Sequence, residues 1–495
     1  MGVLRALISQ SEKGQGRGED HVCDVDQKRH DRTGYVCAKN LCAERLRDTS
    51  SQGRDFHELL VSKPGSGRIT VLRIGQNASS LRALNRKTGG VVNQHTAPVA
   101  VKDRFESLDV LRGLAVLGIL MVNVQAFTMA SNAYVYPPAH MDVSGANLTV
   151  WFLTHVFFEM KFITIFSALF GAGVMLMVGD EPDASRKLHF SRMTWLLVIG
   201  LIHMFGLWFG DILVTYALAG FIIVFFRRMS PAKLIGWGLF WITLSGLLMV
   251  AIFASFVLLP ENMTAVDVGM AYTDEQLADL VNAYQSGYLQ SRIPNALNGL
   301  GNILMFGFFG GRIVGVMLVG MALFKLGFLL GRWSVRNYVI AAAIGLGVGL
   351  PIVAWGGQQA IAHDFALDTL WLHTATNYAG SLLVAFGYAA LINLACKAPW
   401  LKLARLPLAA AGRMAFTNYL TQTITMVFLT VGGVGLGLFG QLERVDQARL
   451  VILIWIIQLI VSPIWLSVFR FGPFEWLWRS LSYGKLQPFM KKSEA

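Results

Sequence analysis

The chain has 495 residues, of which 54% are hydrophobic and 15% charged, and its net charge is +12. Soluble proteins carry about 25% charged residues, so the composition excludes a soluble globular enzyme and indicates a polytopic helical membrane protein. The positive charge does not indicate a nucleic-acid partner, because much of it lies in short segments between apolar runs, where membrane orientation places Lys and Arg.

The chain begins with a long polar stretch. Residues 1–102 are basic and show neither a helical period nor the hydrophobic core of a signal peptide. This composition predicts a disordered cytoplasmic tail, followed by a transmembrane domain over 103–488 and a short cytoplasmic tail over 489–495. Alternatively, Val91 or Val92 marks the natural start, which would put the tail upstream of the protein.

No sequence motif points to a metal or a tightly bound cofactor. Three cysteines lie in the tail, at Cys23, Cys37 and Cys42, and their spacing fits no tight zinc pattern. The spans contain no Walker loop, Rossmann glycine pattern, HExxH or nucleophile elbow. These absences argue against primary pumps, dehydrogenases, metalloproteases and hydrolases.

The apolar runs after residue 103 predict an all-α protein with about ten membrane spans, each near the length needed to cross a bilayer. Basic residues cluster in alternate loops, which places both termini in the cytoplasm. The predicted spans cover residues 108–130, 149–178, 195–209, 212–226, 234–259, 299–324, 338–355, 370–395, 414–431 and 448–469.

The first span carries polar residues on one face. Asp109 stands in the first turn, where the helix dipole favours a carboxylate. Arg112 can extend to the inner surface, where a guanidinium could bind donor phosphates. Asn123 lies roughly 20° off the face of Arg112, so these side chains are predicted to form one polar stripe.

The second span contains His155, Glu159 and Lys161. His155 and Glu159 are one helical turn apart on the same face. They could form a catalytic pair or merely satisfy each other's hydrogen bonds. Lys161 could pair with Glu159 or reach outward to the interface.

The third and fourth spans form a tight hairpin, with Asp211 at the turn and His203 about two turns earlier. An ionisable residue at membrane depth is costly, which makes both residues functional candidates. The structural alternatives are a His203 bonded to a neighbouring helix and an Asp211 that caps the next helix.

The topology predicts that four polar residues meet in the outer half of the membrane. His203 would act as the base, with Asp211 or Glu159 orienting its imidazole and His155 close by. Arg312, near the middle of the sixth span, needs a partner or water and is a further candidate for substrate binding.

Several motifs together resemble a known family over about residues 103–488. The combination is similar to the YeiB-like bacterial inner-membrane family, also called domain of unknown function 418. The matching residues are Ser107-Leu108-Asp109-x-x-Arg112-Gly113 with Met121-Val122-Asn123, Lys161-Phe162-x4-Ser167-x2-Phe170-Gly171-Ala172-Gly173, Gly210-Asp211-Ile212-Leu213, Gly412-Arg413-Met414-x2-Thr417-Asn418-Tyr419, and an interfacial aromatic stretch over 471–479.

The opening Asp-x-x-Arg-Gly pattern is also similar to membrane acyltransferases of the glucosaminide acetyltransferase type. Those enzymes pass an acyl group from a cytoplasmic thioester to a sugar across the membrane. The resemblance therefore implies an acyltransferase-like protein of the bacterial cytoplasmic (inner) membrane, with a thioester such as acetyl-CoA as co-substrate and a glycan or small molecule as acceptor. A transporter or exporter and a non-catalytic membrane scaffold are the alternatives.

Overall fold

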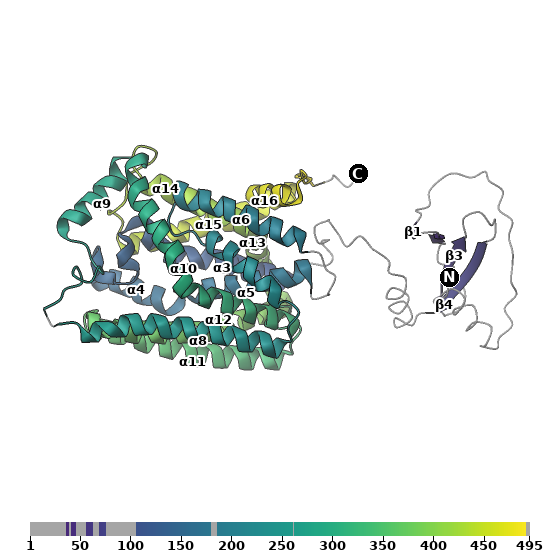
Figure 1. Ribbon diagram of the computed structural model, residues 1–495, viewed down its shortest axis with the longest axis horizontal. Coiled ribbons are helices and arrows are strands. Elements are labelled where there is room, and N and C mark those ends of the chain that lie inside the picture. Colours follow the sequence, from purple (N-terminus) through teal and green to yellow (C-terminus); the bar gives the residue numbers. More distant parts are fainter. Residues whose placement is uncertain are drawn as a thin grey trace. The chain divides into compact units, whose positions relative to one another are not determined.

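A computed structural model describes residues 105–179, 186–260 and 262–491, apart from the side chains of 307–309, together with the backbone of four earlier strands (Figure 1). The chain divides into two units, Met1–Val99 and Ala100–Ala495.

The first unit contains one antiparallel sheet in the order β1-β2-β3-β4. Its strands are β1 (Val36–Ala38), β2 (Leu41–Arg45), β3 (Phe56–Ser62) and β4 (Ile69–Gly75). The remainder of the stretch 1–102 lies outside the described residues, so the disordered tail remains a prediction.

The second unit is helical, which confirms the predicted all-α class of the membrane domain. Its α-helices are α3 (Glu106–Thr128), α4 (Gly145–Phe157), α5 (Lys161–Val178), α6 (Lys187–Gly206), α7 (Leu213–Ile223), α8 (Pro231–Ala254), α9 (Asp274–Ser286), α10 (Tyr288–Lys325), α11 (Val335–Ala362), α12 (Leu370–Lys397), α13 (Lys402–Arg413), α14 (Ala415–Thr430), α15 (Arg444–Val468) and α16 (Pro473–Tyr483). The 3-10 turns are η2 (Ser131–Tyr134), η3 (Pro137–Ala139), η4 (Val224–Phe226), η5 (Ser255–Leu258), η6 (Leu367–Thr369) and η7 (Pro399–Leu401).

Seven helices in the described part of the chain are long and apolar enough to cross a membrane, and α10 adds an eighth if its two segments form one bent span. The larger number expected from the sequence includes α7 and α14, which are shorter. The number of crossings and the side of the termini therefore stay predictions. The basic segment after α12 was expected to be a loop, but most of it forms the amphipathic helix α13.

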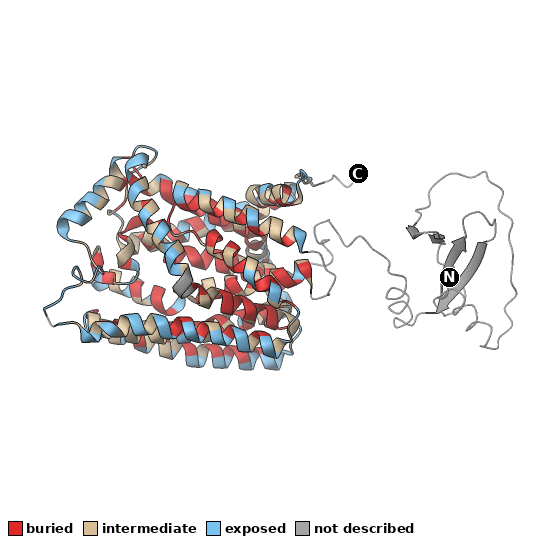
Figure 2. Ribbon diagram, viewed as in Figure 1, coloured by how far each residue is buried: buried red, intermediate tan, exposed pale blue. Residues whose placement is uncertain are grey.

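The helices pack around α3, most of whose residues are buried. In Figure 2, the outer faces of α8 and α11 are pale blue although their sequences are apolar. Leu247 is 65% exposed on α8, and Ile344 is 55% exposed on α11. Apolar side chains that cover two long helices on the outside are suited to lipid.

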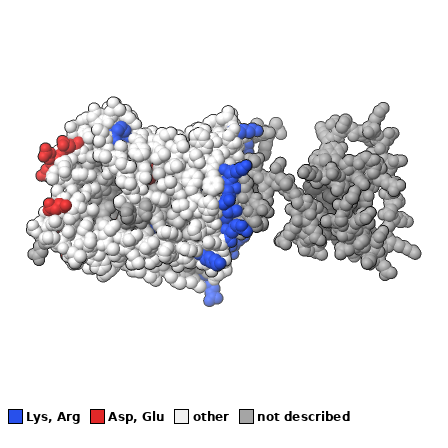
Figure 3. All heavy atoms as spheres, in the orientation of Figure 1, with Lys and Arg blue, Asp and Glu red and all other residues white. Residues whose placement is uncertain are grey.

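Charge divides between the two ends of the bundle. Lys and Arg gather at one end of the face shown in Figure 3, and Asp and Glu gather at the other. Exposed charged residues stand in the first turns of several helices: Lys233 in α8, Arg336 in α11 and Lys402 in α13, and Asp274 and Glu275 in α9. This separation follows the positive-inside pattern, with the basic end predicted to face the cytoplasm.

Two motif glycines bring α3 and α13 into close contact. A Cβ atom on Gly113 would lie 2.0 Å from the carbonyl oxygen of Leu408, and one on Gly412 would lie 1.8 Å from that of Asp109. Only glycine fits a crossing where two backbones touch. The Arg-Gly and Gly-Arg motifs therefore have a structural role in this fold.

Another pair of motifs joins α14 to α16 through Glu475. One carboxylate oxygen of Glu475 accepts from the backbone N–H groups of Phe416 and Thr417, at 2.7 and 3.0 Å. The other accepts from the Thr417 hydroxyl at 2.5 Å. Glu475 thus caps α14 from a different helix, at the end where the dipole favours negative charge.

Replacing Glu475 by alanine is expected to lower the free energy of unfolding by about 2 kcal/mol, because it leaves the first N–H groups of α14 without an acceptor. Denaturant unfolding in detergent micelles measures this loss. Glu275→Ala, on the exposed first turn of α9, is the matched control. Equal stability of the two variants would contradict the cap.

Candidate functional site

The predicted hairpin is present, and its turn carries the candidate base pair. Helix α6 ends at Gly206 and α7 begins at Leu213, with Asp211 between them. The Nδ1 atom of His203 lies 2.7 Å from one carboxylate oxygen of Asp211. The other oxygen accepts from the backbone N–H of Val214 at 2.7 Å. Asp211 therefore caps α7 and orients the imidazole at the same time.

Helix α14 completes this group with two residues that sequence reasoning missed. The Thr423 hydroxyl lies 2.9 Å from Nε2 of His203. One turn earlier, the Tyr419 hydroxyl accepts from the backbone N–H of Ile212 at 3.3 Å. Because Nδ1 donates to Asp211, Nε2 is left to accept from Thr423. We call His203, Asp211 and Thr423 the hairpin triad; all three are buried.

A second group of polar side chains lies where the second predicted span breaks. The predicted span over 149–178 lies within one candidate membrane span, Gly145–Val178, but a short turn interrupts its helix: α4 ends at Phe157 and α5 begins at Lys161. Met160 adopts a left-handed conformation with φ of 63°, which is costly for a residue other than glycine and persists only where the surrounding structure holds it. Glu159 therefore projects from an irregular turn and not from a helix face.

The break positions three of the predicted site residues. Nδ1 of His155 lies 2.7 Å from a carboxylate oxygen of Glu159, and the His155 ring stacks on Trp151 at 5.3 Å between centroids. The ammonium group of Lys161 donates to the His155 carbonyl at 2.5 Å and to the Asn377 side-chain oxygen at 2.6 Å. Through these two hydrogen bonds, Lys161 connects the turn between α4 and α5 to α12.

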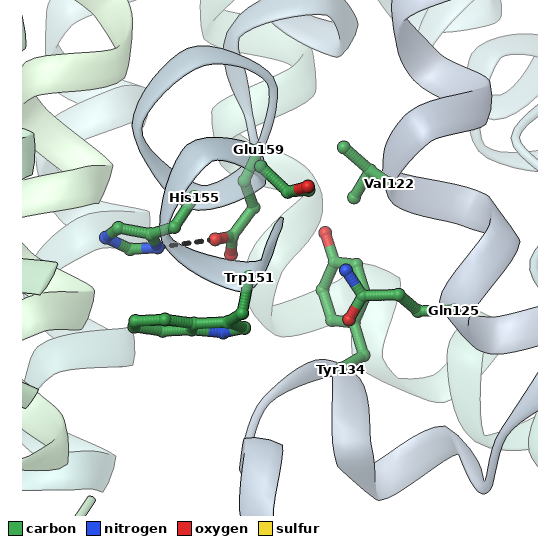
Figure 4. Close-up of a pocket in the computed structure, with 7 residues that line it drawn as sticks. Val122, Gln125, Tyr134, Trp151, His155 and Glu159 are labelled. Carbon is green, nitrogen blue, oxygen red and sulfur yellow. Dashed lines mark hydrogen bonds and ion pairs between the residues drawn. The ribbon is translucent and has the colours of Figure 1, made fainter. Parts of the chain in front are cut away.

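A narrow pocket opens beside Glu159, between α3, η2 and the end of α4 (Figure 4). Its free space suits about one water molecule, so a substrate group larger than a hydroxyl would enter only if the walls moved. The pocket is lined by Val122, Gln125, Tyr134, Trp151, Thr154, His155 and Glu159.

Tyr134 and Gln125 reach into this pocket on the side opposite His155, as Figure 4 shows. Although 39% of Tyr134 is exposed, its hydroxyl end is enclosed. Burial, reinforced by the Glu159 carboxylate and opposed by Arg312, raises the pKa of Tyr134 above its usual value. The phenol therefore stays protonated and can donate a hydrogen bond.

Arg312 is held by neutral groups in the interior. Its guanidinium donates to the Tyr378 carbonyl at 2.9 Å, to the Ser381 hydroxyl at 2.8 Å and to the Thr164 hydroxyl at 3.1 Å. It also lies 4.3 Å from the centre of the Tyr378 ring. These contacts provide the partners that a buried arginine requires.

The predicted site residues form separate groups. In the part of the chain that the structure describes, no hydrogen bond or ion pair joins the hairpin triad to His155 and Glu159. Glu159 therefore orients His155, and Asp211 alone orients His203. Their convergence in one pocket is not seen.

The predicted polar stripe of the first span does not reach either group. Arg112 pairs with Asp109 at 3.0 Å near the basic end. Asn123 is half-buried on α3 and makes no side-chain hydrogen bond to another described residue. No set of three or more metal-ligating side chains is found among the described residues.

Comparison with known proteins gives consistent matches. The family described as "Protein of unknown function (DUF418)" matches residues 323–485, which include Thr423 and Glu475. The uncharacterized protein YeiB of Escherichia coli (strain K12) is 33% identical over 79% of this chain and 99% of its own length. The uncharacterized protein YxaH of Bacillus subtilis (strain 168) is 28% identical over 80% and 98%, respectively. These descriptions state no activity.

Proposed function

The chain belongs to the YeiB-like DUF418 family of membrane proteins, and we propose that it is a membrane-embedded acyltransferase with His203 as its general base. The observation that carries the proposal is the hairpin triad: a carboxylate at 2.7 Å from Nδ1 and a hydroxyl at 2.9 Å from Nε2 of one buried imidazole. This is the arrangement in which a histidine takes a proton from a hydroxyl while a carboxylate fixes its tautomer.

In this reaction the acceptor hydroxyl or amine takes the position beside Nε2 that Thr423 occupies. His203 accepts the acceptor's proton, the acceptor atom attacks the thioester carbonyl, and the carbon–sulfur bond breaks. The proton then passes from His203 to the departing thiolate. Asp211 stabilises the imidazolium formed between these steps.

We assign the donor to the basic end and the acceptor to the opposite side of a bacterial cytoplasmic membrane. An acyl thioester such as acetyl-CoA carries phosphates that a guanidinium can bind, and Arg112 is half-buried at that end. Asp109 would hold Arg112 in position, and Asn123 lies further along the same helix. The acceptor would be an envelope glycan or an extracytoplasmic small molecule.

Transport is the second candidate, because the interior around the α4–α5 break holds several ionisable groups. Lys161 is fully buried two residues after Glu159, and Arg312 is 6% exposed and donates to Thr164, three residues after Lys161. Charged side chains within membrane helices commonly line substrate or proton paths. In that case the same residues would serve translocation and the hairpin triad would be structural.

The test uses purified protein in liposomes with acetyl-CoA and a panel of sugars and polyols. Release of free thiol that depends on protein and acceptor supports acyl transfer. Proton-gradient-dependent flux without thiol release would favour transport. Absence of both would leave a membrane scaffold and overturn the proposal.

A further inference from the structure

Two imidazoles from different helices lie edge to face, and each has an enclosed nitrogen atom without a hydrogen-bond partner among the residues that the structure describes. The atoms are Nε2 of His155 on α4 and Nδ1 of His373 on α12. The ring centroids are 5.9 Å apart, and the rings are inclined by 67°. Buried polar atoms nearly always have a partner, which can be an ordered water. The pair therefore marks a place for a hydrogen-bonding species between α4 and α12.

A pair of glycines on α11 makes room for this arrangement. A Cβ atom on Gly357 would lie 3.0 Å from the ring carbon Cδ2 of His155. A Cβ atom on Gly356 would lie 1.8 Å from the Thr376 hydroxyl and 3.3 Å from the Cα of His373. These glycines thus let α11 approach the His155 ring and the backbone of α12 closely at the junction of three helices.

The two imidazoles connect different surroundings. His155 is hydrogen-bonded through Nδ1 to Glu159, whose side chain is 23% exposed and lines the pocket. His373 stands in the first turn of α12, directly after η6, which carries Asp368 at the acidic end of the bundle. We propose that Glu159, His155 and His373 form a proton-transfer chain, bridged by one water, between the pocket and the acidic end.

One passage moves one proton and converts both imidazoles from the Nε2–H to the Nδ1–H tautomer. Both rings must return to the Nε2–H tautomer before the next proton passes in the same direction. Glu159 takes a proton from a group in the pocket and passes it to Nδ1 of His155. The resulting imidazolium releases its other proton from Nε2 to the bridging water, which protonates Nδ1 of His373. His373 then gives its Nε2 proton to water at the acidic end. Reversal of these steps carries a proton inward.

The charged groups around the proton-transfer chain limit how many protons this chain holds. Lys161 faces it from α5 through the His155 carbonyl, and Arg312 of α10 donates to Thr164, three residues after Lys161. Tyr134, on the far side of the pocket, is the remaining titratable neighbour. With two cations close by, a second stored proton would be repelled, so the chain carries one proton at a time. This role does not depend on acyl transfer.

The stacked indole of Trp151 provides a readout that needs no substrate. A protonated imidazole quenches the fluorescence of an indole that it stacks on. The emission of wild type minus that of Trp151→Phe therefore reports the protonation of His155, and it should fall when the medium is acidified. His155→Gln should abolish this change, which assigns the signal.

The proton-transfer chain is tested by the rate of the Trp151 fluorescence change after a rapid pH jump, with the protein in nanodiscs. His373→Gln should slow it by roughly 100-fold, because a positioned acid–base group is lost, without changing its amplitude. His363→Gln, at an exposed histidine near the same end, should leave the rate unchanged. His373→Asn is the second variant if His373→Gln does not fold. Wild-type rates in both His373 variants, or no pH response of Trp151, would overturn the proposal.

Discussion

Replacing Asp211 by asparagine is expected to lower the rate of thioester-dependent acyl transfer by about 10⁴-fold. An asparagine oxygen can still accept from the backbone N–H of Val214, so the cap on α7 survives. Its NH₂ group, however, would face Nδ1 of His203 and force the proton onto Nε2. The imidazole would then present a donor where the reaction requires a base.

The measurement compares steady-state thiol release and thermal unfolding of the variant with those of wild type. Asp446→Asn is the matched control, since Asp446 pairs with Arg449 on the surface and is 45% exposed. It should retain activity within about two-fold, because exposed ion pairs contribute little. An Asp211→Asn protein that turns over at the wild-type rate would remove the hairpin triad from catalysis.

The hairpin triad could be predicted only in part from sequence. His203 and Asp211 are eight residues apart, and the Gly210-Asp211 break between two apolar runs was enough to place them at one turn. Thr423 is 220 residues from His203. Its contact depends on how α14 is rotated against α6, and no local pattern encodes that rotation. A threonine in an apolar helix gives the same sequence signal whether it is structural or functional.

The break between α4 and α5 shows a different limit. Residues 158–160 contain neither glycine nor proline, so periodicity predicts a continuous helix through them. Met160 is left-handed immediately before Lys161, whose ammonium group donates to Asn377 on α12. Tertiary contacts override local preference here. As a result, Glu159 lines the pocket. Tyr134, which also lines it, comes from the turn η2, whose position the sequence does not predict.

The glycine motif in α5 leads to the largest expected effect on stability. Gly171 packs against α10, where a Cβ atom would lie 2.0 Å from the carbonyl oxygen of Met317 and 2.8 Å from its carbonyl carbon. Both neighbours are backbone atoms, so no side-chain rotation relieves the clash. Gly171→Ala is therefore expected to lower the free energy of unfolding by at least about 3 kcal/mol, or to prevent folding.

Gly173, two residues further along the same helix, is the matched control. A Cβ atom there would meet nothing within 4 Å, and alanine is the better helix former by about 1 kcal/mol. Gly173→Ala should thus be neutral or slightly stabilising in denaturant titrations in micelles. If both substitutions had the same effect, the close approach of α5 and α10 would be wrong. Opposite responses from these two motif glycines would show that Gly171 is required for the short distance between α5 and α10. Gly173 would then make no contribution to this packing.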